Sequence, residues 1–192
     1  MLFSYLSLVF HLVRHFKGIQ PNDRGWKLAT ITAATYGHLD ILRLLCSDPR
    51  SDPGASHNRA VRHALAHQQM EAALFLISDL RVKPDDDGGD VVRNLLCQVI
   101  ECEAPSTARD KAEAVKILLE RGADPNRHNH EALRRSLERH CFPVVDALVR
   151  CPRITMSTGE FYTVLATVPQ TEEYRGTRET LMHSARFRHN FM

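Results

Sequence analysis

The sequence repeats itself with a period of 31 residues, and this period limits the folds that the chain can adopt. The segment Ser-Asp-Pro-Arg-Ser-Asp-Pro at residues 47–53 returns as Ser-Asp-Leu-Arg-Val-Lys-Pro at residues 78–84. An apolar block with a central arginine has the same offset, since residues 60–65 correspond to residues 91–96. A fixed period of this size is typical of small units that stack, because each unit is too short to bury an apolar face alone. The repeat therefore predicts an array of units that share one core.

Each unit contains two short blocks whose apolar residues recur with helical spacing. Further copies of the first block lie at residues 29–34 and 132–137. Copies of the second block lie at residues 39–45, 70–76, 112–119 and 142–148. Polar segments rich in Pro, Asp, Gly and Asn separate the units, at residues 48–58, 84–90 and 122–129. Because no stretch alternates like a strand, the pattern predicts an all-α solenoid of helix-turn-helix repeats.

The repeat blocks place the boundaries of the units. We expect an N-terminal half-repeat or cap at residues 1–22 and a C-terminal repeat or cap at residues 155–192, with helices at 160–168 and 177–186. Four repeats are expected between them, at residues 23–54, 55–85, 86–126 and 127–154. The third is longer, so residues 101–109 are expected to form an extra loop between its helices. Pro143 is expected to open the second helix of the fourth repeat, since the first turn of a helix tolerates proline.

Two of these segments resemble ankyrin repeats. Residues 33–40, Ala-Ala-Thr-Tyr-Gly-His-Leu-Asp, are similar to the turn between the two helices of that family's repeat. Residues 115–126, Val-Lys-Ile-Leu-Leu-Glu-Arg-Gly-Ala-Asp-Pro-Asn, are similar to its end. The resemblance covers about residues 5–154, and the 47–53 loop is similar to a divergent subtype. The family's Thr-Pro-Leu-His tetrapeptide is absent from every copy, so we expect a lower stability than that of a consensus array.

The resemblance implies a non-enzymatic module that binds another protein through its loop tips and the inner face of its first helices. Trp26 and Tyr36 are the expected anchors, since aromatic side chains dominate interface hot spots. Trp26 equally well fits a role in the N-terminal core. The expected partner-binding residues are Arg24, Trp26, Lys27, Thr35, Tyr36, Ala55, Ser56, Asn58, Ala66, His67, Asp86, Asp87, Asn129 and Glu131.

No pattern in the sequence points to catalysis, so we expect no catalytic residue and no cofactor. His63 and His67 share a helix face as zinc ligands sometimes do, but no third ligand has a fixed spacing, and we expect no metal. His140 and Cys141 are adjacent on a helix and point about 100° apart, so they do not form a nucleophile pair. Two alternatives stay open: a fragment of a larger adaptor or effector whose activity lies elsewhere, and a metal-dependent enzyme on a repeat scaffold.

Charge and cysteine content bear on the partner and the compartment. The formal net charge is only +2, so nucleic acid is a poor candidate partner. Only five of the 25 basic residues are lysines, and the excess of arginine favours planar contacts to carboxylates and aromatic rings. Arg62, Arg93 and Arg134 recur at one repeat position, where we expect each to bond loop carbonyls or a neighbouring Asp. The five cysteines cannot all pair, which indicates reduced thiols in a cytoplasmic or nuclear protein. The mean hydropathy of −0.30 is a poor fit to a multi-pass membrane protein, so we expect no membrane span. We also expect a monomer.

The N-terminal segment has two interpretations. Residues 2–13 are mostly apolar, as in the core of a signal peptide, but no basic region precedes them and no small-residue cleavage site follows. We favour a helix at residues 4–16 that caps the array. Its apolar face would pack on the second helix of the next repeat. That face consists of Leu8, Val9, Leu12, Val13 and Phe16, and the expected contacts are Ile41, Leu42 and Leu45.

Removing residues 1–20 tests this interpretation. Without the cap, an apolar face of the first repeat becomes exposed, so we expect aggregation or loss of cooperative unfolding. Thermal unfolding of residues 21–192 beside the full-length chain measures the effect. An unchanged, soluble and cooperative transition would identify the segment as a leader instead.

Overall fold

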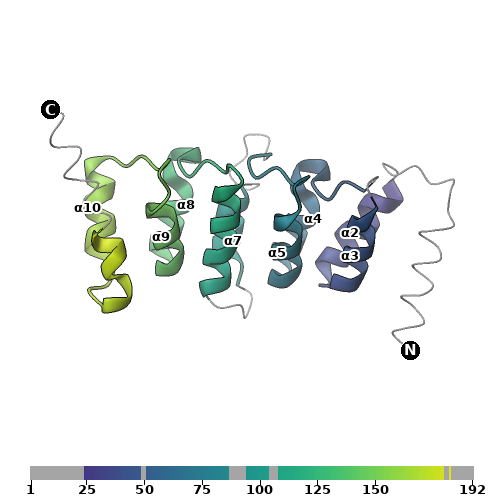
Figure 1. Cartoon of the computed structure of the whole chain (residues 1–192), viewed down its shortest axis with the longest axis horizontal. Helices are drawn as coiled ribbons and strands as arrows, with labels where there is room; N and C mark the ends of the chain where they lie inside the picture. The colour runs from purple at the N-terminus through teal and green to yellow at the C-terminus, as the bar shows by residue number, and fades with distance from the viewer. Residues whose placement is uncertain (1–23, 49–50, 87–93, 104–107, 180–181, 183–192) are drawn as a thin grey trace. The chain divides into compact units, whose positions relative to one another are not determined.

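All regular elements in the described part of the chain are helices. The computed structural model describes residues 24–48, 51–86, 94–103, 108–179 and 182 (Figure 1). The elements are α2 (Arg24–Thr35), α3 (Leu39–Ser47), α4 (Ala55–Ala66), α5 (Met70–Ser78), α6 (Leu95–Glu101), α7 (Ala108–Glu120), α8 (Arg127–Glu138), α9 (Phe142–Val149), α10 (Thr158–Thr167) and the 3-10 helix η2 (Glu172–Tyr174). These ranges contain no strand, which confirms the all-α prediction. The cap helix expected at residues 4–16 lies outside the described residues.

The chain divides into two compact units, and the division runs through α6. In the first unit α2 packs on α3 and α4, while α5 packs on α3 and α4. In the second unit α9 packs on α7 and α8. Consecutive helices therefore pair as hairpins, and helices of the same kind also pack on one another. The hairpins α2–α3, α4–α5 and α8–α9 each fall inside one predicted repeat.

Small residues line the contact between the first helices of the first unit. Ala33 and Ala34 of α2 and Ala60 and Ala64 of α4 are all buried. Side chains of this size let two helices approach closely, and they cost little side-chain entropy on folding.

Larger apolar residues fill the contacts of the second helices. Leu42 and Leu45 of α3 and Leu76 and Ile77 of α5 are almost completely excluded from solvent. Burying each such side chain stabilises the fold by roughly 1.5–3 kcal/mol. The apolar spacing that predicted the helices is therefore the spacing of the core.

Large apolar residues are also buried on the second helices of the second unit, α7 and α9. Val115 and Leu118 of α7 and Val144 and Leu148 of α9 are buried. Pro143 lies in the first turn of α9, as predicted from its sequence position.

Helix α10 starts with a capping box, whose two reciprocal hydrogen bonds join Ser157 and Glu160. The Ser157 hydroxyl accepts from the Glu160 amide at 3.2 Å, and Glu160 Oε2 accepts from the Ser157 amide at 2.8 Å. Two backbone donors that the first turn of a helix leaves unpaired are thereby satisfied.

The turn inside each hairpin uses one left-handed residue. Gly37, Gln68 and His140 occupy this position with φ of 68°, 61° and 51°. In the first copy the Gly37 amide donates to Ala34 at 3.2 Å and the His38 amide to Ala33 at 2.9 Å. The same pair of bonds recurs around Gln68 and His140, so all three helices end in one C-terminal motif. Only the first copy has the residue for which this conformation costs little.

The extra loop of the third repeat is shorter than predicted. Residues 101–109 were expected to be irregular, but Glu101 ends α6 and Ala108 already begins α7. Helix α6 begins after Asn94, whose side chain accepts from the Cys97 amide at 3.2 Å. At its end the Cys102 amide still donates to the Gln98 carbonyl at 3.0 Å, so helical bonding continues through Glu101.

Substitutions at the hairpin turn should change stability in opposite directions. A non-glycine residue in the left-handed region costs roughly 1–2 kcal/mol, so we expect Gln68→Gly to raise the free energy of unfolding by about 1 kcal/mol. Gly37→Ala should lower it by about the same amount. The added Cβ would also lie 2.2 Å from Oε1 of Gln69, which must then move. Urea unfolding followed by circular dichroism measures both changes. If both substitutions changed the free energy of unfolding in the same direction, the left-handed turn assigned to both positions would be contradicted.

Candidate functional site

Two loop tips contain an unusual left-handed turn. Ser56, His57 and Asn58 have φ of 57°, 57° and 55°, so three consecutive residues reverse the helical hand at the start of α4. Residues 128–130 do the same at the start of α8, with φ between 52° and 58°. Three such residues are costly for an L-amino-acid chain, so other contacts must hold the turn. This turn was not predicted from the sequence.

In the first unit, hydrogen bonds hold the turn to the loop that follows α5. Asn58 is buried, and its Nδ2 donates to the Lys83 carbonyl at 2.6 Å. Nδ1 of His57 lies 2.8 Å from Oδ1 of Asp86. Nε of Arg62 donates to the His57 carbonyl at 2.9 Å, which is the contact with a loop carbonyl that we predicted for this arginine. Asn58 and Asp86 were expected to contact a partner, but their side chains bond to other residues of this chain.

The predicted arginine ladder does not extend to Arg134. Its guanidinium pairs with the carboxylates of Glu131 and Glu138 on its own helix and not with loop carbonyls. Glu131 also accepts from Nε of Arg135 at 2.6 Å. Hydrogen bonds from Arg135 and Arg134 hold the pKa of Glu131 below its usual range against the opposing effect of burial. Glu131 is therefore a buried structural carboxylate, and Arg93 lies outside the described residues.

A different arginine holds the loops of the first unit, and sequence reasoning missed it. Nη2 of Arg81 donates to the Cys46 carbonyl at 2.7 Å and Nη1 donates to the Ser51 carbonyl at 2.6 Å. Nε donates to Oδ1 of Asp79 at 2.9 Å, which orients the guanidinium. The flat five-donor group suits several fixed acceptors at once. The signal was present in the sequence, since Arg81 belongs to the repeated Ser-Asp-x-Arg segment.

The second unit uses Arg153 in a similar way. Its Nη1 donates to the Gly122 carbonyl at 3.0 Å, and its Nη2 donates to the Leu119 carbonyl. Both acceptors lie at the end of α7, where a helix leaves carbonyls unpaired.

The thiols are buried. None of the five cysteines forms a disulfide, and this includes Cys97 and Cys102. Burial and the nearby Asp79 carboxylate raise the pKa of Cys46 to about 11, although Arg81 opposes them. Burial also raises the pKa of Cys141. Thiols in such surroundings are poor nucleophiles, because the thiolate is the reactive form.

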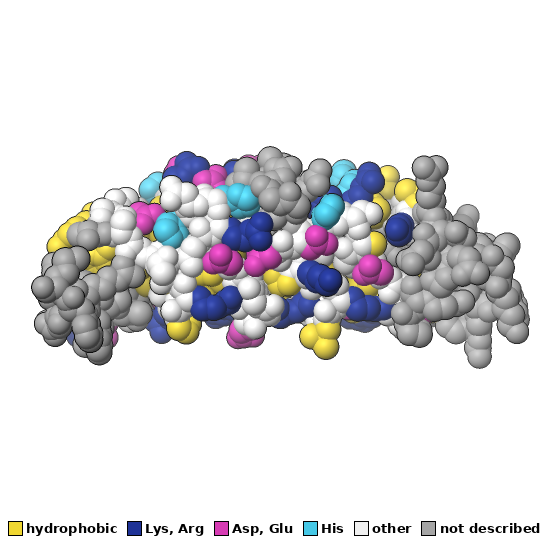
Figure 2. All heavy atoms as spheres, turned by 90° about the horizontal axis from the view of Figure 1, so that it is seen from above, with side chains coloured by type: hydrophobic (Ala, Val, Ile, Leu, Met, Phe, Trp, Pro, Cys, Tyr) yellow, Lys and Arg dark blue, Asp and Glu magenta, His cyan; other side chains and the backbone are white. Residues whose placement is uncertain are grey.

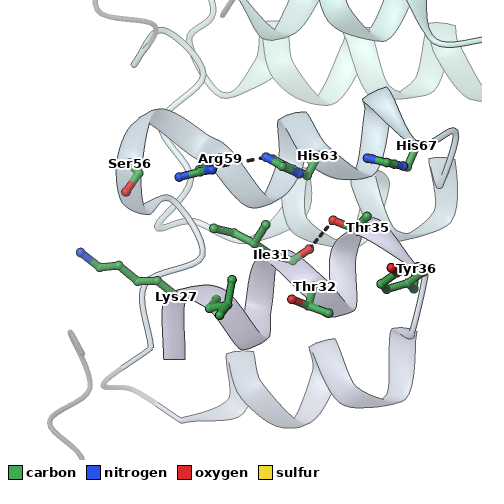
Figure 3. Close-up of a pocket in the computed structure, with 10 residues that line it drawn as sticks. Lys27, Ile31, Thr32, Thr35, Tyr36, Ser56, Arg59, His63 and His67 are labelled. Atoms are coloured by element: carbon green, nitrogen blue, oxygen red, sulfur yellow. Dashed lines mark hydrogen bonds between the residues drawn. The ribbon is translucent and has the colours of Figure 1, made fainter. Parts of the chain in front are cut away.

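An open groove of about 750 Å³ runs between α2 and α4 (Figure 3). Helix α2 contributes one row of side chains and α4 contributes the facing row. Members of each row recur every three or four residues, so they share one face of their helix. The lining residues are Lys27, Leu28, Ile31, Thr32, Thr35 and Tyr36 on the α2 side, and Ser56, Arg59, His63 and His67 on the α4 side.

The α4 side of the groove is basic. Nε of Arg59 donates to Nε2 of His63 at 3.4 Å, and the rings of His63 and His67 stack with centroids 6.2 Å apart. Burial, followed by the charges of Arg59, His67 and Arg62, holds the pKa of His63 below its usual range. Among the described residues no Asp or Glu lines the groove. Elsewhere the charges mix, as Figure 2 shows for one face where blue and magenta side chains adjoin.

The α2 side is largely apolar and exposed. Leu28 is 64% exposed and Tyr36 is 66% exposed, although both belong to residue types that fold into cores. Thr35 donates its hydroxyl hydrogen to the Ile31 carbonyl at 2.7 Å, so that hydroxyl is satisfied by its own helix. Apart from Lys27, the α2 wall of the groove thus presents aliphatic, aromatic and threonine side chains, and the α4 wall is basic.

The groove brings together five of the predicted partner-binding residues: Lys27, Thr35, Tyr36, Ser56 and His67. Trp26 is only 8% exposed and therefore belongs to the core, which decides between its two interpretations. Ala55 and Ala66 do not line the groove, and Asn129 is exposed in the left-handed turn of the second unit. Arg24 is the first residue of α2, and Asp87 lies outside the described residues.

Sequence reasoning missed Leu28, Ile31, Thr32, Arg59 and His63 as groove residues. The four-residue spacing of Arg59, His63 and His67 was visible in the sequence. Which face of α4 stays open depends on its contact with α2, and no local pattern shows that contact.

The described residues contain no group of three or more His, Cys, Asp or Glu side chains arranged to hold a metal ion. None of the helices that they form is long and apolar enough to cross a membrane.

Replacing the loop arginine tests its structural role. Arg81→Lys keeps the charge but loses the planar fork, so we expect the free energy of unfolding to fall by roughly 1.5–3 kcal/mol. Arg43→Lys on the exposed side of α3 is the matched control and should change it by less than about 0.5 kcal/mol. Urea unfolding compares the two. Equal effects of both substitutions would show that the Arg81 bonds to the loop carbonyls do not stabilise the fold.

Comparison of the chain with models of protein families, with curated proteins and with solved structures finds no match.

Proposed function

We propose that this chain is a non-enzymatic protein-interaction module with an ankyrin-like repeat fold, and that its partner docks in the α2–α4 groove. The packing of consecutive hairpins supports the fold, since α2 packs on α4 and α3 packs on α5. The shared left-handed turn at Gly37, Gln68 and His140 supports it further. A solenoid of such hairpins presents a preformed surface to another protein.

The exposure of Leu28 and Tyr36 in an open groove carries the proposal. Exposed apolar side chains that are gathered in a hollow mark interaction sites more often than isolated ones do. A tyrosine there combines a large contact area with a hydroxyl that tolerates water, as interface hot spots require. We take Tyr36 as the anchor and Leu28 as its apolar neighbour.

The thiols support a binding module in a reducing compartment. Five buried cysteines without a disulfide are compatible with the cytoplasm or the nucleus, where thiols stay reduced. The raised pKa of Cys46 and Cys141 argues against thiol catalysis. We propose that the chain acts as a monomer, which leaves its groove open to a different protein.

A photo-crosslinking amino acid at position 36 tests the docking site. Placed there in the full-length chain in cells of its source, it should form one discrete covalent adduct with a partner protein. The same amino acid at position 162 is the matched control, because Tyr162 is 58% exposed but lies on α10 outside the groove. We expect no such adduct from position 162.

A second substitution ties the adduct to the groove. Leu28→Arg places a charge on the apolar wall and should reduce the adduct from position 36 at least tenfold, with an unchanged circular dichroism spectrum. Adducts of equal yield from both positions, or an adduct that Leu28→Arg leaves intact, would contradict docking in the groove.

A further inference from the structure

We infer that the α2–α4 groove selects an extended acidic segment of its partner, in which carboxylates alternate with apolar side chains. This inference rests on the proposed function, because it specifies the chemistry of the segment that docks there. It goes further by assigning a direction to the segment's side chains. Carboxylates face α4, and apolar side chains face α2.

Unbalanced positive charge is the first reason. Lys27 and Arg59 are permanent cations in the lining, and His63 and His67 are two further basic groups. Within the described residues no carboxylate lines the groove or forms an ion pair with Lys27 or Arg59. Positive charges without a neighbouring carboxylate give the groove a potential that attracts an incoming anion.

Several other arginines of the described chain have a carboxylate partner that Arg59 lacks. Arg81, Arg134, Arg135, Arg150 and Arg175 each form an ion pair with an Asp or Glu. The Arg59 guanidinium instead donates a 3.4 Å bond to a histidine nitrogen. An arriving carboxylate would supply the charged acceptor that these five arginines already have.

The spacing on α4 fits an extended segment. Arg59, His63 and His67 are four residues apart, which corresponds to about 6 Å along a helix. Alternate residues of an extended chain are about 6.6 Å apart and point to one side. Carboxylates at alternate positions can therefore meet these three groups in turn. The intervening residues point the other way, toward Leu28, Ile31 and Tyr36.

The groove is less suited to single-stranded nucleic acid. Such sites stack successive bases on several aromatic side chains along a basic path. Among the described residues that line this groove, Tyr36 is the single aromatic residue apart from the two histidines. The net charge of the whole chain is only +2, so little long-range attraction to a polyanion is expected.

His63 makes the affinity depend on pH. Arg59, Arg62 and His67 on α4 and Lys27 on α2 are the charged or titratable groups near His63, and α5 contributes no residue to the lining. Burial, together with these basic groups, holds the pKa of His63 below its usual range, so His63 is neutral at pH 7.5, whereas Glu side chains stay ionised down to about pH 5. A bound carboxylate favours the protonated imidazole of His63. Binding of an acidic segment therefore takes up protons and becomes tighter as the pH falls from 7.5 to 6.0.

Binding of defined peptides to the full-length chain tests the inference. The probe is a fluorescein-labelled, end-capped peptide Gly-Ser-Glu-Leu-Glu-Phe-Glu-Ser-Gly, and anisotropy measures its dissociation constant. We expect it to bind at least tenfold more tightly than the same peptide with Gln in place of Glu. It should also bind more tightly than a peptide in which the three Glu residues are consecutive. Affinity should rise about threefold between pH 7.5 and pH 6.0.

Two pairs of variants separate the groove from general charge effects. Lys27→Gln/Arg59→Gln should weaken binding at least tenfold. Arg43→Gln/Lys83→Gln removes two exposed cations of the same unit outside the groove and should change binding by less than twofold. A single variant, His63→Gln, should abolish the increase at pH 6.0. Unchanged circular dichroism spectra and urea midpoints show that each variant is folded.

Several outcomes would overturn the inference. Equal affinity for the Glu and Gln peptides, or no binding of either, shows that charge does not select the segment. If Lys27→Gln/Arg59→Gln and Arg43→Gln/Lys83→Gln weaken binding of the Glu peptide equally, the attraction is non-specific. Tighter binding of an oligothymidylate with the same charge identifies the groove as a nucleic-acid site. Equal affinity for the consecutive-Glu peptide refutes the alternation.

The two proposals fail separately. A crosslink from position 36 without affinity for the Glu peptide leaves docking intact and refutes the acidic preference. Peptide binding without a crosslink to a protein retains the acidic preference of the groove and refutes the proposed cellular role.

Discussion

A hairpin of two short helices has more apolar surface than it can bury by itself, and this shortage governs the architecture. Within the first unit, the first helices of the two hairpins pack on each other, and so do the second helices. Alanines close the contact between α2 and α4, and leucines and isoleucine fill the contact between α3 and α5. Because the buried faces are narrow, the opposite face of each first helix remains available for polar or functional side chains. The groove is a consequence of how the core is shared.

The loops need a separate means of support, since they contain few apolar residues. Arginine and asparagine side chains provide it by bonding to backbone carbonyls. Arg81 spans from its own loop to the end of α3, and Arg153 spans to the end of α7. Asn126 donates to the Arg153 carbonyl at 2.8 Å and accepts from the Thr155 amide at 2.8 Å. Backbone groups at helix ends, which would be costly to leave unpaired, thereby hold each loop to its neighbour.

This support explains how the chain tolerates its left-handed turns. Residues 56–58 adopt a conformation that is unfavourable in isolation, but Asn58 is buried and bonded and Arg62 holds the His57 carbonyl. The turn also sets where α4 begins its right-handed course, and hence which way Arg59, His63 and His67 point. The basic wall of the groove is thus linked to the loop that precedes it. A strained local conformation contributes to the candidate site by orienting a helix.

Local information in the sequence determined the helices, their order and the hairpin turns. Apolar spacing predicted α3, α5 and α9 closely, because the periodicity that defines a helix is also the periodicity of its buried face. The repeat offset aligned Gly37 with Gln68, since the turn depends only on hydrogen bonds within a few residues. Lys27, Tyr36 and His67 were placed in the candidate site by the resemblance alone.

Only the tertiary structure decided which polar residues are exposed. Asn58 and Glu131 were expected at a surface but are buried, and Trp26 joins the core. Their environment comes from loops and helices that pack from elsewhere in the chain, as the Asn58 bond to the Lys83 carbonyl shows. Arg59 and His63 entered the groove for the same reason. A residue's position on a helix is a local property, but its exposure depends on what packs against that helix, and no short segment of sequence specifies both partners of a contact.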